Sequence, residues 1–458
     1  MQGVTLTVAI IFSTLAISLP PAYALAAYFT ALIWYPPFLA VSIGTIDILV
    51  GRFVVTVLLL RCFCDKNIRS NFVWSKYDTY VLASMAVYVG MALLYFNPPK
   101  MDVVENRSGF LMDTFFAYLA VRFIITDIDR LKTVIKCVAV ILVPLAIFGV
   151  VESVTGWQPF APLRRFSPWY RGIAFVSQGR FGFIRAVGPF SHAILFGGGF
   201  AMFLPLIYYL RFEKGKWHTM AYFLSAAALV GTLSSMSSGP WVMAAVVIFC
   251  LFMERHRRYV KLMLLTGAFA CIMLGIISNR PFYHVIASWA NPLGGAGWHR
   301  AQLIDVAIKH FNDWWLTGYG DNDPGWGHYF GMGITDITNE YILEGVRYGI
   351  WGVIALCTVL VVTFRSLMSM YKRLTHPQLK SLCWAYGSLM VSVIVTWVSV
   401  SFFGQLLSLF YCILGMIGSM SNKRFDWKVP DRMVYYIVPK QPSREISLSS
   451  VKTSVEDG

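Results

Sequence analysis

The chain has 458 residues, of which 57% are hydrophobic and only 13% are charged. Soluble domains carry about 25% charged residues, so this composition excludes a water-soluble globular protein and predicts an all-α, polytopic integral membrane protein. The formal net charge of +15 does not require nucleic acid, because short loops of membrane proteins use Lys and Arg to orient their helices. We therefore expect membrane lipids around the chain and no nucleic-acid partner.

Apolar segments recur along the chain, and most approach the length of about 20 residues that crosses a bilayer as helix. Pro20-Pro21 and Pro36-Pro37 interrupt the first two segments, which form either two helices or one helix and a re-entrant piece. The first segment lacks the positive start of a cleaved signal peptide. We expect about 12 transmembrane helices, within roughly 11 to 13. The candidate segments are residues 4–19, 22–42, 46–63, 77–96, 110–126, 133–151, 192–210, 218–235, 240–253, 260–278, 339–363, 381–400 and 403–419.

Basic clusters in the connections between these segments give the orientation, because Lys and Arg concentrate on the cytoplasmic side. Counting segments places all of the clusters on one side, so residues 421–458 are expected to be a cytoplasmic polar tail after a single transmembrane domain, residues 1–420. Two long loops, residues 152–191 and 279–338, are then extracytoplasmic. The clusters are Arg61/Lys66/Arg69, Arg130/Lys132, Arg211/Lys214/Lys216, Arg255/Arg257/Arg258/Lys261, Arg365/Lys372/Arg373 and Lys423/Arg424.

The first outer loop departs from this charge pattern, because it is rich in arginine and contains one acid, Glu152. Guanidinium groups bind phosphate oxygens in pairs, which predicts a docking site for a diphosphate or another anionic headgroup. Anchoring to lipid headgroups, or pairing with acids of the second outer loop, is the alternative. The arginines are Arg164, Arg165, Arg171, Arg180 and Arg185.

The second outer loop is rich in Trp and Tyr, whose faces suit sugar rings but also favour the membrane interface. Apolar spacing predicts a helix over residues 299–315, expected to lie on the membrane surface. The Gly-rich stretch from Gly318 to Gly333 is expected to be irregular, with re-entry into the membrane near Asn339. The aromatic residues are Trp289, Trp298, Trp314, Trp315, Trp326, Tyr319 and Tyr329.

Four short stretches share their order and spacing with the motifs of one known group. They are Arg185-Ala-Val-Gly-Pro-Phe-Ser-His192, Ser237-Ser-Gly-Pro-Trp241, Arg300 with Leu316-Thr-Gly-Tyr-Gly320, and Thr338-Asn-Glu-Tyr341 with Tyr348-Gly-Ile-Trp-Gly352. Over residues 180–360 the chain resembles the O-antigen ligase and O-antigen polymerase superfamily of polytopic membrane glycosyltransferases. Two departures stand out. The second stretch lacks the family's arginine, and Thr338 occupies the position of the family's histidine.

The resemblance implies transfer of a glycan from an undecaprenyl-diphosphate carrier to an acceptor hydroxyl, on the outer face of the bacterial cytoplasmic membrane. Polymerisation is favoured over ligation to a lipid A core, and other polysaccharide-assembly proteins are expected partners. No nucleotide, metal or other cofactor is expected. The chain has no Walker A motif and no strand-preceded dinucleotide fingerprint, and Asp321-Asn-Asp323 is the nearest approach to a metal motif. Cys62 and Cys64 form an isolated C-x-C without the second pair of a zinc site.

Without the family's histidine, another residue has to accept the proton of the acceptor hydroxyl. Glu340, His328 and Asp336 are the expected catalytic residues, and His299 is a further possibility. Glu340 is equally explained as an acid at a helix N-terminus. The expected substrate-binding residues are Arg185, Arg300, Arg180, His192, Asn339, Trp315 and Tyr319. Two other classes stay open: a transporter or flippase of lipid-linked sugar, and a non-catalytic partner of a polysaccharide machine. The scarcity of charges in the spans, namely Asp47, Arg52, Asp113 and Arg122, argues against transport.

Overall fold

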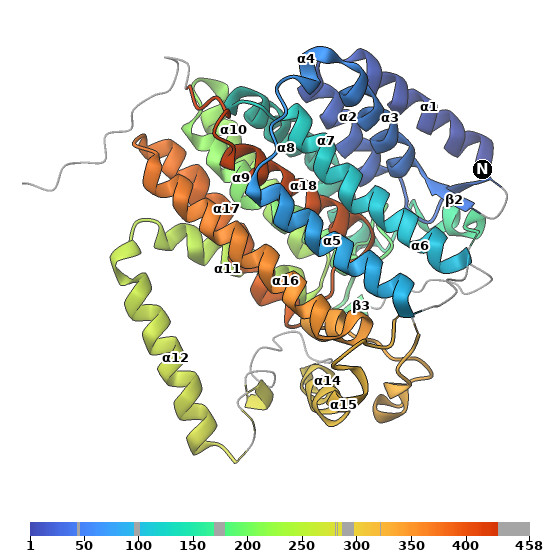
Figure 1. Ribbon diagram of the computed structural model, residues 1–458, viewed down its shortest axis with the longest axis vertical. Coiled ribbons are helices and arrows are strands. Elements are labelled where there is room, and N and C mark those ends of the chain that lie inside the picture. Colours follow the sequence, from blue (N-terminus) through green and yellow to red (C-terminus); the bar gives the residue numbers. More distant parts are fainter. Residues whose placement is uncertain are drawn as a thin grey trace, which may run out of the picture.

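The computed structural model describes residues 1–43, 46–95, 101–168, 179–279, 281, 283–285, 297–320 and 322–428. Most of these residues form a bundle of helices (Figure 1). Within the described residues, seven helices are long and apolar enough to cross a membrane. They are α5 (Lys76–Tyr95), α8 (Ile128–Thr155), α9 (Ala193–Tyr209) with the short η3 (Leu210–Phe212), η4 (Arg257–Tyr259) with α12 (Val260–Ile277), α16 (Glu340–Arg373), α17 (Pro377–Trp397) and α18 (Gly404–Ser421).

Helices that are shorter or less apolar occupy the other predicted segments, so each expected apolar segment contains helix. The all-α prediction is therefore confirmed, and the seven long apolar helices suggest a multi-pass membrane protein by their length and hydropathy. The count of about 12 crossings stays a prediction. The helices of these other segments, together with α4 in a connection, are α1 (Gln2–Ser18), α2 (Pro21–Trp34), α3 (Val50–Cys64), α4 (Lys66–Arg69), α6 (Met101–Leu111), the π-helical η1 (Met112–Phe116), α7 (Ala117–Ile124), α10 (Lys216–Ser234) and α11 (Ser238–Met253).

The second predicted segment, residues 22–42, is wrong at its C-terminal end. Helix α2 stops at Trp34, just before Pro36-Pro37, because a proline disfavours helical geometry in the residue before it. Strand β1 (Ala40–Ile43) follows and pairs antiparallel with β2 (Ile46–Leu49), Val41 lying opposite Ile48. Branched side chains fit such a pleated pair. A second small hairpin, β3 (Gly179–Arg180) with β4 (Phe183–Ile184), lies in the first long loop.

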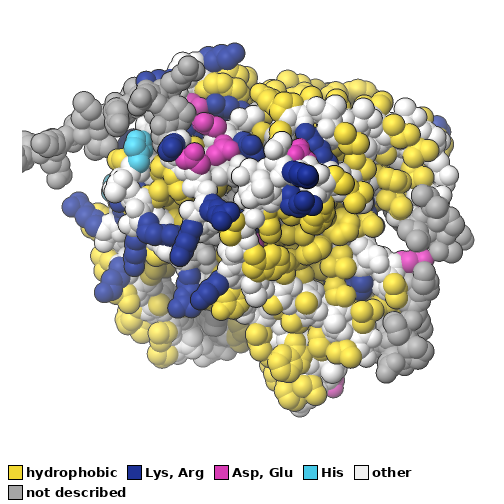
Figure 2. All heavy atoms as spheres, turned by 45° about the horizontal axis from the view of Figure 1, so that its top comes forward, with side chains coloured by type: hydrophobic (Ala, Val, Ile, Leu, Met, Phe, Trp, Pro, Cys, Tyr) yellow, Lys and Arg dark blue, Asp and Glu magenta, His cyan; other side chains and the backbone are white. Residues whose placement is uncertain are grey.

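Several of the basic connections meet at one end of the bundle, which we call the basic end. It lies along the upper and upper-left margin of Figure 1. Ion pairs and backbone bonds join its loops. Lys132 pairs with Glu213 at 2.8 Å, Arg211 pairs with Glu254 at 3.3 Å, and Ile128 donates to the Asp426 carbonyl. Figure 2, which brings the top of Figure 1 forward, shows many Lys and Arg side chains beside extensive hydrophobic surface.

The two long loops lie at the opposite, lower end of the bundle in Figure 1, which we call the loop end. The second loop contains α14 (Gly297–Lys309), α15 (Phe311–Trp314) and the 3-10 turn η5 (Trp326–Phe330). The helix predicted over 299–315 is thus present, broken once at His310. Helix α16 begins directly after Asn339, where re-entry was predicted. The first loop contributes the 3-10 turn η2 (Ala161–Phe166) and the β3–β4 hairpin.

Helix α9 lies near the centre of the bundle and determines where the first long loop ends. In its most apolar stretch 89% of the residues are buried, against 0% in α12, which stands apart at the lower left of Figure 1. A Cβ on Gly197 would overlap Ser235 and Pro240, so glycine at this position lets α9 approach the turn between α10 and α11. That turn is consequently held beside the start of α9, at the loop end.

Candidate functional site

Three arginines from the two long loops converge on one short turn. Arg180 donates to the carbonyl of Met236 at 3.5 Å. The other two arginines bond to side chains: Arg185 donates to Ser237 Oγ at 3.3 Å, and Arg300 donates to Ser238 Oγ at 3.4 Å. We call these three arginines and two serines the arginine site. The structure thus brings together the three arginines expected to bind substrate.

The segment around Arg185 is fixed by backbone bonds to two helices. Ala186 donates to the carbonyl of Ser234 at the end of α10, at 3.1 Å. The next two amides, of Val187 and Gly188, donate to the carboxylate of Glu152 at 3.1 and 2.8 Å. Glu152 is buried near the end of α8. Glu152, predicted as the first residue of the loop, belongs to α8, which continues to Thr155, and it anchors the arginine segment by accepting these two amides.

The turn itself presents the N-terminus of α11. Ser237 is the N-cap residue of α11, and its hydroxyl makes no capping hydrogen bond. The first amides of a helix have no partner within the helix and carry the positive end of its dipole. Such helix starts bind phosphate oxygens. Met236 holds a φ of 44°, a conformation unusual for a residue with a side chain. The turn is thus shaped to place two hydroxyls and a helix start against the arginines.

The electrostatics of the arginine site favour an anion. Burial and the neighbouring Arg180 lower the pKa of Arg185 to about 10. The same two causes lower the pKa of Arg300, whose buried Nε has no hydrogen-bond partner among the described residues. Within the described parts of the chain, neither Arg180 nor Arg300 forms an ion pair with a carboxylate. The expected alternative, pairing with acids of the second loop, is therefore not seen for these two.

His192 lies beside these arginines as the N-cap of α9. Its Nδ1 accepts the amide of Ile194 at 3.1 Å. Burial, followed by the nearby Arg185, Arg164 and Arg180, lowers the pKa of His192 to about 4. The ring is consequently neutral near pH 7 and acts as a hydrogen-bond acceptor. Arg164 contributes to the same positive region but is held by the Phe190 and Ser191 carbonyls at 3.4 and 3.3 Å; Arg171 lies outside the described residues.

A second histidine, His299, adjoins Arg300 in α14. It is 7% exposed, its ring lies 4.4 Å from that of Phe330, and its Nε2 has no hydrogen-bond partner among the described residues. Burial lowers the pKa of His299, Asp336 opposes this shift, and Arg300 adds to it. Asp336 itself is exposed. His299 is therefore a neutral, buried histidine whose pKa responds to both Asp336 and Arg300.

His328, another expected catalytic residue, belongs to the irregular part of the second loop. It is exposed, and its Nδ1 lies 2.7 Å from the carbonyl oxygen of Gly325. Its ring also contacts the ring of Tyr329, with 4.0 Å between centroids. These contacts are those of a turn residue within η5. Nothing described joins His328 to the arginine site.

Asn339 and Glu340 form structural hydrogen bonds at the start of α16. Asn339 Oδ1 accepts the amide of Ile342 at 3.1 Å as the helix cap, and its Nδ2 donates to the Val398 carbonyl at 3.0 Å. Glu340 is 4% exposed and accepts the amide of Phe402 at 2.8 Å. The side chain of Glu340 also lines an interior cavity of about 200 Å³. None of the three arginines of the arginine site lines that cavity.

This cavity, which we call the ionic cavity, contains more charge than the sequence pattern suggested. Arg52 and Asp113 form an ion pair at 2.7 Å, and Arg107 donates to the hydroxyl of Tyr348 at 2.6 Å. The buried Oε2 of Glu344 has no hydrogen-bond partner among the described residues. Glu340 and Arg347 complete its charged lining. Charged groups buried between apolar helices are costly unless they are paired or functional.

The expected sugar-binding aromatics divide into exposed and packed side chains. Trp315 is 43% exposed, whereas Trp314 and Trp326 are buried in the core of the second loop. Tyr319 is half-buried, 6.2 Å from Trp326 in an edge-on contact. Of these four, Trp315 is the most exposed, and the others pack within the loop. Trp289 lies outside the described residues.

Backbone bonds dock this loop onto a kink in α16. Gly349 has a φ of 65° inside α16, and its neighbour Ile350 donates to the carbonyl of Trp315 at 2.7 Å. The amide of Tyr319 donates to the carbonyl of Val346 at 2.6 Å. A Cβ at Gly349 would overlap the Leu316 carbonyl. Glycine at the kink therefore lets the loop backbone reach α16, which fixes the loop carrying Arg300.

The described residues contain no group of three or more His, Cys, Asp or Glu side chains that could hold a metal ion. Asp323 serves as a turn acceptor for the Gly325 and Thr335 amides at 2.8 and 3.1 Å. The pKa of Asp323 is lowered, first by the hydroxyl of Thr335 and then by these amides. Its expected partner in the Asp-Asn-Asp stretch, Asp321, lies outside the described residues.

No protein-family model matches this chain, and no curated protein matches it in sequence.

Two parts of the site were not among the residues predicted from sequence. Ser237 and Ser238 were recognised as part of a motif, but their role as arginine partners depends on contacts 52 and 62 residues apart. His299 was considered as a base without any sign that it is buried beside Arg300. Its position within the apolar spacing of α14 was the available signal, since a histidine on that face is expected to be buried.

Proposed function

We propose that this protein is a membrane glycosyltransferase of cell-surface polysaccharide assembly, and that its arginine site binds the diphosphate of an undecaprenyl-diphosphate-linked glycan. One observation supports this most strongly. Three arginines from two loops meet at the start of α11, where Arg185 and Arg300 donate to the hydroxyls of Ser237 and Ser238 and Arg180 donates to the carbonyl of Met236. Guanidinium forks, hydroxyls and a helix N-terminus are the groups that proteins use for phosphate oxygens. The motif resemblance over residues 180–360 points to the same substrate.

In the proposed reaction the acceptor oxygen forms a bond to the anomeric carbon of the glycan, and the bond from that carbon to the carrier diphosphate breaks. The leaving diphosphate takes the electron pair, so it needs cations more than it needs a proton. Arg180, Arg185 and Arg300 would supply that stabilisation without nucleotide or metal. The acceptor hydroxyl loses its proton to a base.

His299 is the base that we propose, in place of the histidine that the related motif has at Thr338. It is neutral because burial lowers its pKa, it adjoins Arg300, and its Nε2 is available. Asp336 raises the pKa of His299 and would stabilise the protonated ring after it takes the proton. Glu340 is the alternative base, and its contact with Phe402 in a separate cavity favours a structural role. Trp315 would supply an exposed face for a sugar ring.

The proposal includes a topology. The basic end faces the cytoplasm, the loop end faces outward, and about 12 helices cross the bacterial inner membrane. Other polysaccharide-assembly proteins would bind beside it. Reporter fusions or cysteine labelling at Trp315 and Lys372 test this arrangement. Labelling of both positions from the same side would contradict it.

Purified protein in nanodiscs should be offered undecaprenyl-diphosphate oligosaccharide without nucleotide and without metal. Growth of the lipid-linked chain, followed by mass spectrometry, is the result expected of a polymerase. Transfer that requires a lipid A core acceptor would instead make the protein a ligase. Absence of transfer with both acceptors, in a sample whose folding is verified, would contradict the proposed activity.

A transporter or flippase of lipid-linked sugar is the second candidate, and the ionic cavity favours it. Arg52, Asp113, Arg107, Glu344 and Arg347 gather in one cavity between helices, and ionisable residues inside a helix bundle commonly mark transport pathways. Proteoliposomes loaded with fluorescent lipid-linked oligosaccharide discriminate the two. Movement of lipid between leaflets without any change in glycan length would favour transport, and would leave the arginine site as a headgroup receptor.

A further inference from the structure

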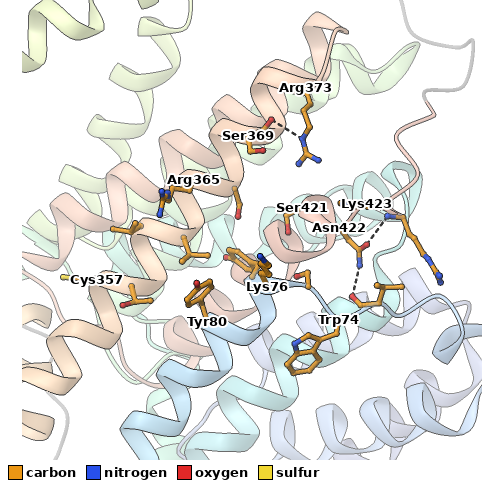
Figure 3. Close-up of a pocket in the computed structure, with 18 of the residues that line it drawn as sticks. Trp74, Lys76, Tyr80, Cys357, Arg365, Ser369, Arg373, Ser421, Asn422 and Lys423 are labelled. Carbon is orange, nitrogen blue, oxygen red and sulfur yellow. Dashed lines mark hydrogen bonds between the residues drawn. The ribbon is translucent and has the colours of Figure 1, made fainter.

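A large groove lies at the basic end of the bundle, whereas the arginine site lies at the loop end. It has a volume of about 1000 Å³ and lies between α5, α16 and the end of α18 (Figure 3). Tyr77 and Thr363 join α5 to α16 at its base, with their hydroxyls 2.9 Å apart. Asn422 closes one side by donating to the carbonyl of Val73 at 2.8 Å. The groove is therefore walled by three elements that are bonded to one another.

The charge lining this groove is entirely positive. Its five charged residues are basic, and no acidic residue lines it. None of the five forms an ion pair with a carboxylate of the described residues. The neighbouring acid, Asp78, is buried and paired with Arg122 at 2.6 Å, so it does not neutralise the groove. The five are Lys76, Arg365, Arg373, Lys423 and Arg424.

The groove also changes character along α16. Its α16 residues recur every three to four positions, as single residues or adjacent pairs, and therefore lie on one face of the helix. Ile354, Cys357, Val361 and Val362 form the apolar half, and Arg365 to Arg373 form the basic half. From Ile354 to Arg373 the stripe extends roughly 28 Å at 1.5 Å per residue. Trp74 and Tyr80, aromatic types that favour the membrane interface, lie on the side of the groove opposite α16 in Figure 3.

We propose that this groove binds an anionic phospholipid from the membrane leaflet at the basic end. The phosphate headgroup would lie among Arg365, Lys76 and Arg373, and an acyl chain would follow the apolar half of the α16 stripe. Two features favour a lipid over free phosphate: the apolar half continues directly from the cations, and the stripe has the length of a headgroup with part of a chain. Basic pockets between transmembrane helices are known to bind such headgroups. The site lies outside the machinery proposed for glycan transfer.

Native mass spectrometry of the purified protein tests this directly. Dioleoyl phosphatidylglycerol and dioleoyl phosphatidylcholine have the same chains and differ in net charge. We expect a retained adduct with the anionic lipid and a much weaker one with the zwitterionic lipid. Each cation near a headgroup is worth about fivefold in binding, so Arg365→Gln combined with Lys76→Gln should weaken the anionic adduct roughly twentyfold or more. Arg365→Lys should restore most of the binding that Arg365→Gln removes.

Lys372→Gln is the matched control, because Lys372 is an exposed cation next to Arg373 that does not line the groove. It should leave the anionic adduct unchanged. Equal binding of the two lipids, or equal effects of Lys372→Gln and Arg365→Gln, would overturn the proposal. Competition by millimolar inorganic phosphate would overturn the assignment to a lipid. The experiment measures lipid binding at the basic end, so its result does not depend on whether the protein transfers glycan.

Discussion

Arg300 donates a hydrogen bond to the hydroxyl of Ser238 at 3.4 Å, although the two residues are 62 positions apart. This contact joins the second long loop to the start of α11. The first loop reaches the adjacent Ser237 through Arg185. A diphosphate bound at this junction would touch groups from three separate segments, so its binding would depend on how each segment is held.

Substitution of Gly349 by alanine should destabilise the protein and displace the second loop. Alanine is strained at a φ of 65° and would overlap the carbonyl of Leu316. Strain of this kind costs roughly 1–3 kcal/mol. Thermal unfolding in detergent measures the effect. Gly267→Ala on α12 is the control, because nothing lies within 4 Å of the place that its methyl group would occupy; an equal loss of Tm in both variants would contradict the account.

Glu152→Ala should loosen the segment that carries Arg185. It removes the acceptor of the Val187 and Gly188 amides, and leaving a buried donor unsatisfied costs about 1–3 kcal/mol. We expect a lower Tm and weaker binding of the lipid-diphosphate donor. Thr155→Ala removes an exposed hydroxyl at the same end of α8 and should change neither quantity. Unaltered donor binding in Glu152→Ala would show that this anchor does not position Arg185.

His299→Gln should lower the rate of transfer about 10²- to 10⁴-fold if His299 is the base, while leaving donor binding intact. His328→Gln removes an exposed turn residue and should have little effect. Because the pKa of His299 lies below its usual value, the wild-type rate should hold steady down to about pH 6.5 and fall only at lower pH. Single-turnover kinetics across this range provide the test. A full rate in His299→Gln would exclude the histidine as the base.

The cap of α9 predicts a pH dependence of stability. The pKa of His192 is about 4 in the folded protein and about 6.5 in an unfolded chain. Between these values the unfolded state binds more protons, so the free energy of unfolding decreases as the pH falls from 6.5 towards 4. His192→Asn keeps a capping acceptor but cannot titrate. The drop in Tm between pH 7 and pH 5 should therefore be smaller in His192→Asn, and an equal drop would contradict this role.

The lengths of the apolar segments predicted the helices, and the unusual positions of some arginines predicted part of the candidate site. Arg180 and Arg185 were chosen because the first outer loop is rich in arginine, and Arg300 was chosen because of the motif resemblance. The β1–β2 hairpin was not predicted, because residues 40–49 are as apolar as a helix and periodicity alone does not separate the two.

The hydrogen-bond partners of these arginines could not be predicted from local sequence pattern. Ser237 and Ser238 meet them only through tertiary contacts that glycines in α9 and α16 permit. Glu340 follows Asn339 in both the motif and the structure. Whether its carboxylate faces the arginine site or the ionic cavity depends on the loop containing Phe402, which packs against α16 from 62 residues away.

The central claim is that the arginine site holds the carrier diphosphate, and Arg300→Ala tests it most directly. Release of undecaprenyl diphosphate from the lipid-linked donor should be measured for wild type, Arg300→Ala and Arg165→Ala. Arg165 is an exposed arginine of the first loop that contacts Phe166 and has no part in the site. The account predicts near-complete loss in Arg300→Ala, a wild-type rate in Arg165→Ala, and similar Tm values in all three. Equal rates in Arg300→Ala and wild type would contradict it.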